Sequence, residues 1–247
     1  MTIETSVEAT SESTAAAPPR SQFVRFIFFK VRPDWYALPA AARQQASDEL
    51  SDLLARWSDR CMVRTYSLVG FRHDVDLMVW LATEDPVDLH EFGTALAAST
   101  FGRHADIPQS FLSMTKHSSY VKNHRETRPN GHRLRLAPGD AAYLFVYPFV
   151  KTRAWYALPL AERQAMMNEH IRVGTGFPSV KINTTYSFGL DDQEFVVAFE
   201  TDEPRDFLDL VMALRETKAS AYTLRDTPMY TCKRATTAEV VAMLAAT

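Results

Sequence analysis

The chain contains an internal duplication, and this feature constrains its fold more than any other. Its clearest trace is the pentapeptide WYALP, which occurs at 35–39 and again at 155–159. The same offset of 120 pairs Tyr66 with Tyr186, and the offset falls to 118 after the next turn. A pattern repeated at a fixed spacing means that one supersecondary unit is built twice. The chain is therefore expected to fold as two related halves.

Each half is predicted to have the element order βαββαβ. Apolar, β-branched runs at 23–31 and 143–150 are typical of strands. Apolar residues with helical spacing follow Pro39 and Pro159. Proline is tolerated in the first turn of a helix, so both prolines are predicted to mark helix starts. Two strands, a second helix after Pro86 or Pro204, and a last strand complete each half. The remaining strands are expected at 62–70, 75–83, 109–116, 179–188, 194–201 and 227–234.

The predicted fold class is α+β, with tandem ferredoxin-like repeats forming a dimeric α/β barrel-like subunit. Helices would cover one face of each antiparallel sheet, and the other two faces would pack together. Ser, Thr, Ala and Glu dominate residues 1–21, which we expect to be a disordered tail. The first repeat would span 22–116 and the second 142–247, with a connector of basic residues at 117–141.

Bulk properties exclude several classes of function. A net charge of −3 and the absence of a basic run with interleaved aromatics disfavour a nucleic-acid partner. No apolar run approaches the roughly 20 residues that span a membrane, and no secretory signal begins the chain. Cys61 and Cys232 belong to no metal or disulfide pattern. A cytoplasmic protein is expected.

Positions where the two copies differ are candidates for a single functional site, because residues needed only for folding should recur. His170 stands where the first copy has Leu50, in the last turn of the predicted helix. One interpretation is a histidine stabilised by the negative end of the helix. The other is an axial ligand of haem-type iron, with Met167, one turn earlier, as part of an apolar floor.

The opening strand of the second copy adds a phenol and an amine. Tyr147 replaces Ile27, and Lys151 replaces Val31. Pro148 removes a ladder hydrogen bond, which predicts that Tyr147 lies at an edge or bulge and can face a cavity. The alternative is a strand tyrosine with its hydroxyl in solvent beside a snorkelling lysine.

The predicted connector is rich in basic residues. Such a run is either a solvated loop or a clamp for carboxylates, which guanidinium groups bind in bidentate fashion. The residues are Lys122, Arg125, Arg128, Arg133 and Arg135.

Two segments, YPFVKTRAWYALPLAERQAMMNEH (147–170) and YSFGLDDQEFVVAFE (186–200), resemble the chlorite dismutase-like haem proteins, and within them the coproheme decarboxylases. The resemblance covers nearly the whole chain after the tail. It implies a haem pocket formed mainly in the second repeat and a ring-shaped homo-oligomer, commonly a pentamer. Iron-coproporphyrin III (coproheme) or haem b would be both substrate and redox centre, and no other metal is expected.

The resemblance also assigns roles to residues. His170 matches the proximal iron ligand, Tyr147 the tyrosine that becomes a radical, and Lys151 the lysine near the reacting propionate. Arg133 matches a propionate-holding arginine, with Arg135 as its alternative. The remaining residues expected to contact the cofactor are Ser119, Phe149, Trp155, Met167 and Asn183.

The implied reaction is the oxidative decarboxylation of coproheme to haem b by hydrogen peroxide, through a tyrosyl radical. The alternatives are a chlorite dismutase or peroxidase-like haem b enzyme, and a non-catalytic haem carrier. Chlorite-degrading members of the family have an arginine above the iron, and thirteen residues beyond His170 this chain has Asn183, with Lys181 or Thr185 as the alternatives that a gap would bring to the pocket. Trp155 also has a packing interpretation, because Trp35 recurs in the first copy. Glu216 is a candidate acceptor for the His170 ring N–H.

Overall fold

The computed structural model describes residues 20–118, 120 and 134–245. The first half comprises β1 (Phe23–Val31), α1 (Pro33–Tyr36), α2 (Ala40–Ser58), β2 (Met62–Ser67), β3 (Leu77–Thr83), α3 (Pro86–Ala98), α4 (Thr100–Arg103) and β4 (Ala105–Met114). The second comprises β5 (Tyr143–Lys151), α5 (Arg153–Ala157), α6 (Leu160–Thr175), β6 (Lys181–Tyr186), β7 (Phe195–Thr201), α7 (Pro204–Arg215), the 3-10 helix η3 (Lys218–Tyr222), β8 (Thr223–Arg225), β9 (Tyr230–Ala235) and α8 (Thr237–Ala245). The predicted α+β class and the repeated βαββαβ order are confirmed. The predicted tail, except its last two residues, lies outside the described residues.

Hydrogen bonds join the strands of both halves into one closed ring. The strand order is β7-β6-β4-β1-β3-β2-β9-β5, and β5 pairs back with β7. The two halves meet along β2 and β9 and at the single pair Met114 and Tyr186 of β4 and β6. Closure of the ring pairs backbone N–H and C=O groups that would stay unpaired at the edge strands of two separate sheets. The predicted sheet-on-sheet packing is thus realised as a barrel.

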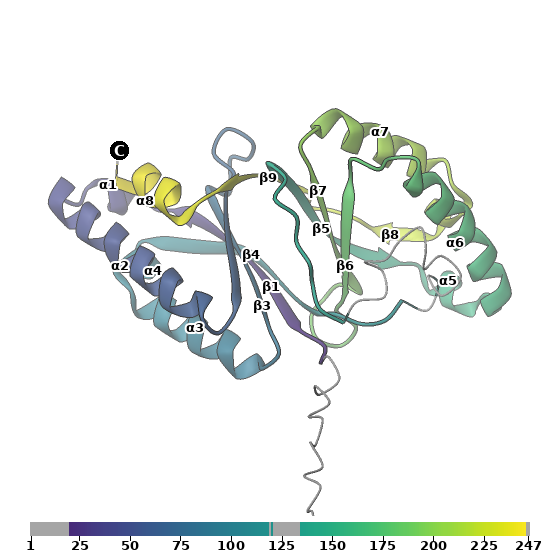
Figure 1. Cartoon of the computed structure of the whole chain (residues 1–247), viewed down its shortest axis with the longest axis horizontal. Coiled ribbons are helices and arrows are strands. Elements are labelled where there is room, and N and C mark those ends of the chain that lie inside the picture. The colour runs from purple at the N-terminus through teal and green to yellow at the C-terminus, as the bar shows by residue number, and fades with distance from the viewer. Residues whose placement is uncertain (1–19, 119, 121–133, 246–247) are drawn as a thin grey trace, which may run out of the picture.

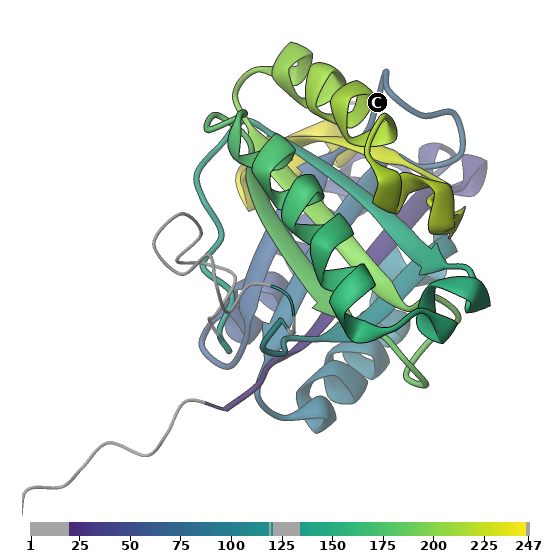
Figure 2. The same cartoon turned by 90° about the vertical axis from the view of Figure 1, so that its right-hand side faces the viewer.

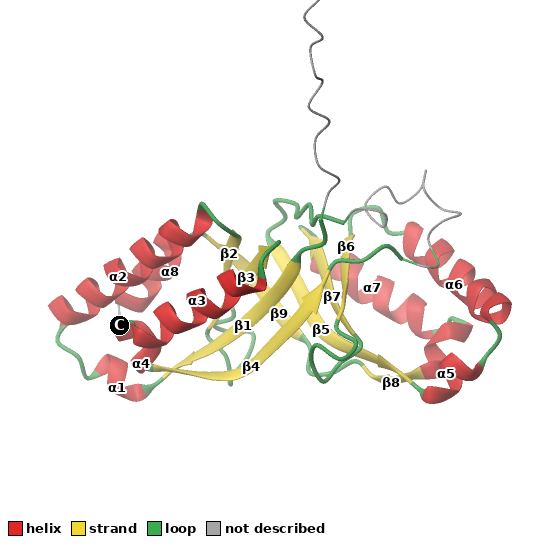
Figure 3. Ribbon diagram, turned by 90° about the horizontal axis from the view of Figure 1, so that it is seen from below, coloured by secondary structure: helices red, strands yellow, loops and turns green. Residues whose placement is uncertain are grey.

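Side chains alternate between the inside of this barrel and its outer faces. Inside, Phe26 and Trp80 from the first half share a core with Val146 and Tyr230 from the second. Outside, α2 and α3 cover the first half, and Phe199 packs beneath α7 in the second. Figures 1 and 3 show the helices gathered at the two ends with the strands between them. Each half therefore has an outer layer in which its helices pack against its sheet. The region between helices and sheet is called the outer chamber of that half.

The C-terminal helix α8, which the sequence pattern did not predict, returns to the first half (Figure 1). Val240 and Leu244 are buried in the outer core beneath α2. The Trp35 indole N–H donates to the carbonyl of Leu244 at 2.9 Å. The outer chamber of the first half is thus filled partly by a helix that follows the second half in the chain.

Across the described parts of the chain, no helix is both long and apolar enough to cross a membrane. Cys61 and Cys232 are buried, free thiols. They belong to different cores, Cys61 to the outer core of the first half and Cys232 to the barrel interior.

Candidate functional site

One face of β5 carries the phenol and the amine that the first half lacks. Tyr147, Phe149 and Lys151 share this face because side chains alternate along a strand. The ladder pairs Tyr147 with Val197 of β7. The first-half counterparts Ile27 and Val31 lie in the outer core under α2. The face is therefore the outer one, and Figure 2 shows α6 and α7 lying across it.

Pro148 sits at a break in the ladder on one side of β5. Pairing with β9 ends at Val146, and pairing with β8 begins at Val150. On the other side, β7 pairs with β5 without interruption from Tyr143 to Phe149. The predicted edge position of Tyr147 is therefore correct only locally, because β5 is otherwise an interior strand of the ring. The missing proline N–H falls where no partner strand requires it.

Tyr147 lies in an apolar wall of the outer face. Its side chain is 7% exposed, and its ring stacks on Phe199 at a centroid distance of 5.8 Å. Burial raises the pKa of the Tyr147 phenol, the negative charge of Asp226 raises it further, and Arg215 acts in the opposite direction. Arg215 and Asp226 themselves form an ion pair. The phenol therefore keeps its proton at neutral pH.

Lys151 is held in the same wall with its amine ordered. The Nζ donates to the carbonyl of Ala219 in η3 at 2.6 Å. It also lies 4.7 Å from the ring centroid of Trp155 and 5.2 Å from that of Phe149. Burial lowers the pKa of Lys151 to about 8, and the charge of Glu194 partly opposes this. The amine is thus mostly protonated at pH 7, yet poorly solvated.

His170 lies near the end of α6 and is half-buried. Its Nδ1 is 3.5 Å from the Thr217 hydroxyl, which immediately precedes η3. Thr217 in turn donates its hydroxyl to the carbonyl of Leu214 at 2.7 Å. The turn at 217–219 therefore contacts both His170 and Lys151, through Thr217 and Ala219. It brings the predicted iron ligand and the predicted propionate partner to one chamber.

The helix that carries His170 packs less closely on its sheet than its counterpart does. In the first half, Leu50, Leu53 and Leu54 of α2 are at most 2% exposed, whereas only Ile171 and Gly174 of α6 are buried. The sheet beneath shows the same contrast. On the outer face of the sheet, Val79 is 2% exposed in the first half, while its counterpart Val197 is only partly buried. The side chains between α6 and its sheet are therefore less buried than those at the equivalent positions of the first half.

The side chains of this region have the chemistry that a flat, largely apolar ligand with acidic edges would need. Aromatic and aliphatic side chains wall the region, Lys151 supplies a cation, and His170 supplies a nitrogen ligand. Met167, predicted as part of the floor, is half-buried one turn before His170. A separate groove of about 740 Å³ runs along α6 and is lined by Met166, Glu169 and Lys218 among others. Neither His170 nor Tyr147 lines that groove.

Trp155 packs much as its counterpart in the first half does. It is 3% exposed, and its ring lies 5.6 Å from that of Tyr222 and 6.3 Å from that of Tyr120. Trp35 is fully buried in the equivalent place. The structure adds one difference between the two tryptophans, because among the described residues a lysine amine lies over the ring of Trp155 and none over that of Trp35. Contact of Trp155 with a cofactor stays a prediction.

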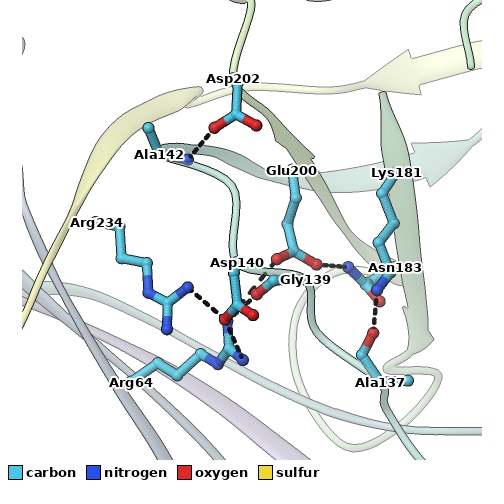
Figure 4. A network of polar contacts seen from close by, with 10 residues as sticks. All are labelled: Arg64, Ala137, Gly139, Asp140, Ala142, Lys181, Asn183, Glu200, Asp202 and Arg234. Carbon is cyan, nitrogen blue, oxygen red and sulfur yellow. Dashed lines mark hydrogen bonds and ion pairs between the residues drawn. The ribbon is translucent and has the colours of Figure 1, made fainter. Parts of the chain in front are cut away.

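Asn183 does not lie on the face of Tyr147, which corrects the expectation that it would stand above the iron. It pairs with Ala198, whose side chain lies in the barrel interior. Figure 4 shows its amide turned to Glu200, and the Nδ2–Oε1 distance is 2.7 Å. Lys181 and Thr185 alternate to the same side. The residues of β6 on the side of Tyr147 are Ile182, Thr184 and Tyr186.

The expectation for Asn183 rested on a count of thirteen residues beyond His170, and between α6 and β6 the two copies differ in length by one residue. The sequence offset of 120 pairs Tyr66 with Tyr186, but Tyr66 faces the barrel interior. Tyr66 pairs with Met78, whose counterpart Val196 pairs with Thr185. The structural offset along β6 is therefore 119, and a slip of one residue moves every side chain to the opposite face. Tyr66 and Tyr186 therefore lie on opposite faces of their strands, although the sequence offset pairs them.

The basic connector residues are not brought to this chamber by the described part of the chain. Arg133 and Ser119 lie outside the described residues. Arg135 is exposed and pairs with Glu84 at 2.5 Å, beside a polar groove of the first half. Glu194 and Thr217 were missed by sequence reasoning. Glu194 could have been found, because the first copy has an acidic residue, Asp76, at the matching position.

Sequence profiles and known structures place this architecture among related proteins. The profile of the family described as chlorite dismutase matches residues 43–235. The chain is 30% identical to a coproheme decarboxylase from Mycolicibacterium smegmatis, over 90% of this chain and 94% of that protein. It is 28% identical to a chlorite dismutase from Ideonella dechloratans, over 82% of this chain and 72% of the relative.

The fold comparison agrees. A crystal structure of a mutant chlorite dismutase from Candidatus Nitrospira defluvii superimposes with a TM-score of 0.84 at 28% identity. The match covers 91% of this chain and 95% of that one. The similarity therefore extends over both halves and includes the β5–α6–β6 region that carries the chamber.

Proposed function

Because the chain belongs to the chlorite dismutase family, we propose that it is a haem-dependent oxidoreductase that converts coproheme to haem b with hydrogen peroxide. The observation that carries this proposal is the composition of the second outer chamber. Tyr147 and Lys151 lie on β5 and His170 on α6, and the first half has Ile27, Val31 and Leu50 in their places. A phenol, an amine and an imidazole in one chamber are costly to bury without a use.

His170 would hold the iron through a ring nitrogen, with Thr217 orienting the imidazole from the Nδ1 side. Met167 and the apolar wall around Phe199 would support the two faces of the macrocycle. Bound coproheme supplies an iron that peroxide oxidises, together with the propionates that react. The protein contributes position, charge and exclusion of water.

Tyr147 would be the residue that transfers oxidation from the iron to the substrate side chain. Burial keeps the phenol protonated, so its oxidation must release both an electron and a proton and yields a neutral phenoxyl radical. This radical would abstract a hydrogen atom from a propionate and recover the phenol. Loss of carbon dioxide, together with transfer of a second electron to the remaining oxidising equivalent of the peroxide, would leave a vinyl group. Each vinyl group formed from a propionate carboxylate consumes one peroxide and one proton and releases one carbon dioxide and two waters.

Lys151 would receive the carboxylate of the reacting propionate. Its pKa of about 8 leaves the amine charged at pH 7, and its bond to the Ala219 carbonyl sets its direction. A carboxylate arriving in this desolvated place gains a charge-assisted hydrogen bond of more than usual strength. The same contact would align the propionate with Tyr147 on the same face of β5.

Chlorite dismutation is the second candidate, because a chlorite dismutase is among the relatives. That activity in the family depends on an arginine above the iron. Ile182 and Thr184, the residues of β6 that lie toward the face of Tyr147, carry no charge. The chamber therefore offers chlorite no fixed cation on this strand, which favours decarboxylation.

The test is mass spectrometry of protein loaded with ferric coproheme, before and after titration with peroxide. We expect two successive losses of about 46 mass units, each one formic-acid equivalent. Tyr147→Phe should bind coproheme and fail to lose mass. Tyr143→Phe, on the same face of the same strand, is the matched control and should react normally. Intact coproheme in the wild type, with oxygen release from chlorite by the haem b form, would establish the second candidate instead.

We further propose a homo-oligomer of the pentameric kind, since the resemblance implies such a ring. Sedimentation velocity of the purified protein measures this directly. A monomer at micromolar concentration would contradict it.

A further inference from the structure

Glu194 is a buried carboxylate that ties the end of β5 to α5. It directly precedes β7 and is 8% exposed. Its Oε2 accepts the backbone N–H of Lys151 at 2.8 Å and the hydroxyl of Tyr156 at 2.6 Å. Its own backbone N–H donates to the Phe149 carbonyl at 3.2 Å. It therefore fixes the point from which the Lys151 side chain leaves the strand.

The first half contains the same arrangement, in which a carboxylate accepts a backbone N–H at the end of the first strand while its own N–H donates back to that strand. This arrangement is called the frame, and in the first half it lacks the amine. Asp76 accepts the backbone N–H of Val31 at 2.9 Å, and its own N–H donates to the Phe29 carbonyl at 2.8 Å. There the carboxylate is neutralised by Lys30, whose Nζ lies 2.8 Å from it. Lys30 corresponds to Val150 in the second half. The frame is thus structural in both copies. The copies differ because a lysine neutralises Asp76 and no described cation forms an ion pair with Glu194.

Within the described residues, no lysine, arginine or histidine forms an ion pair with Glu194. Its charge therefore acts on the nearby amine of Lys151, whose pKa it raises against the larger effect of burial. The other titratable groups on the elements around Lys151 are Arg153 and Tyr156 on α5, Lys218 and Tyr222 on η3, and Arg225 on β8. None of these described groups is a carboxylate; outside these three elements, Glu169 of α6 accepts the backbone N–H of Lys218, and Asp226 directly follows β8.

We propose that Glu194 is a positioning residue of the second chamber: it anchors the base of the Lys151 side chain and keeps the amine charged for a substrate carboxylate. The proposal rests on the proposed function for its carboxylate substrate. Tyr156 completes the arrangement by donating to the same oxygen, so that the acid is satisfied without an arginine or lysine to cancel its charge.

The test compares Glu194→Gln with Asp76→Asn. Glutamine can still accept the two hydrogen bonds of Glu194 but has no charge, and Asp76→Asn makes the same change in the frame that lacks the amine. The first readout is NMR titration of the ¹³Cε signals in lysine-labelled protein without porphyrin, with the Lys151 signal assigned from Lys151→Arg. The second is the pH dependence of peroxide-driven vinyl formation. Glu194→Asp keeps the charge and serves as the rescue variant.

In Glu194→Gln we expect the Lys151 titration to move about one pH unit lower, the usual size for loss of one near charge. At pH 8 the charged fraction, and with it the rate, would fall about fivefold. Asp76→Asn and Glu194→Asp should leave the titration in place. An unmoved Lys151 signal in Glu194→Gln would overturn the inference. A moved signal in a protein that leaves coproheme intact would support the electrostatic role and remove the decarboxylase function.

Discussion

The two outer chambers can be distinguished by one pair of matched substitutions, Leu50→Ala and His170→Ala. The two residues occupy equivalent positions on α2 and α6. Leu50 is 1% exposed within a tight apolar core, whereas His170 is half-buried beside Thr217. If the second chamber receives a ligand, Leu50→Ala should lower the stability of the free protein but keep the stabilisation by ligand. His170→Ala should do the reverse.

The magnitudes follow from this burial. Truncation of a fully buried leucine removes its transfer free energy and leaves a cavity, at a cost of about 2–5 kcal/mol in the free energy of unfolding. His170 is less buried than Leu50, so its truncation should cost the free protein less, about 1 kcal/mol. With coproheme at 100 times its dissociation constant, binding should stabilise the native state by about 2.7 kcal/mol. His170→Ala should lose much of that increment, and Leu50→Ala should keep it.

The assay is urea denaturation followed by circular dichroism, with and without ferric coproheme. The ferric absorption spectrum serves as the control, since it should change in His170→Ala and stay unchanged in Leu50→Ala. Destabilisation of the free protein by His170→Ala equal to that by Leu50→Ala would refute the interpretation. His170 would then be a core residue, and α6 would pack as α2 does.

Three further outcomes are expected. Asn183→Ala should cost about 1–3 kcal/mol of stability, because it leaves the buried Glu200 carboxylate short of a donor, while coproheme affinity measured by fluorescence quenching stays unchanged. A changed affinity would place Asn183 at the ligand after all. The pKa of Lys151, about 8 in the folded protein, lies below its unfolded value of about 10.4, so the unfolded chain binds this proton more tightly. The wild type should therefore gain stability relative to Lys151→Met as the pH rises from about 8 to 10, and parallel pH profiles in urea denaturation would contradict this. Thr217→Val should alter the iron-imidazole stretch in resonance Raman spectra while preserving binding, and an identical spectrum would exclude Thr217 as the orienting residue.

Most of the fold could be predicted because duplication doubles the information in a pattern. A weak strand signal in one copy is supported by a stronger one in the other, and a proline before each long helix marks both starts. Helix α8 escaped prediction since its role is to cover the first half, a long-range contact that no local pattern records. Closure into a barrel likewise depends on pairings between strands far apart in the sequence.

The candidate site was predictable where the copies differ in chemistry within a secure register. Tyr147 and Lys151 could be found in this way, because β1 and β5 align without a gap and both pair with a matching strand. His170 followed from the same alignment through the WYALP motif. The recurrence of an acid at Asp76 and Glu194 was readable from the sequence, but only the contacts reveal that Asp76 is neutralised by a lysine and Glu194 is not.

The sequence by itself determined that two similar units occur and that only the second has a phenol, an amine and an imidazole at these positions. Only the tertiary structure decided which face of β6 meets them. Between α6 and β6 the chain passes through a turn whose length the repeat leaves ambiguous by one residue, and in a strand one residue reverses every side chain. The ladder from β6 to β7 removes that ambiguity, which is why Ile182 and Thr184, and not Asn183, lie toward Tyr147.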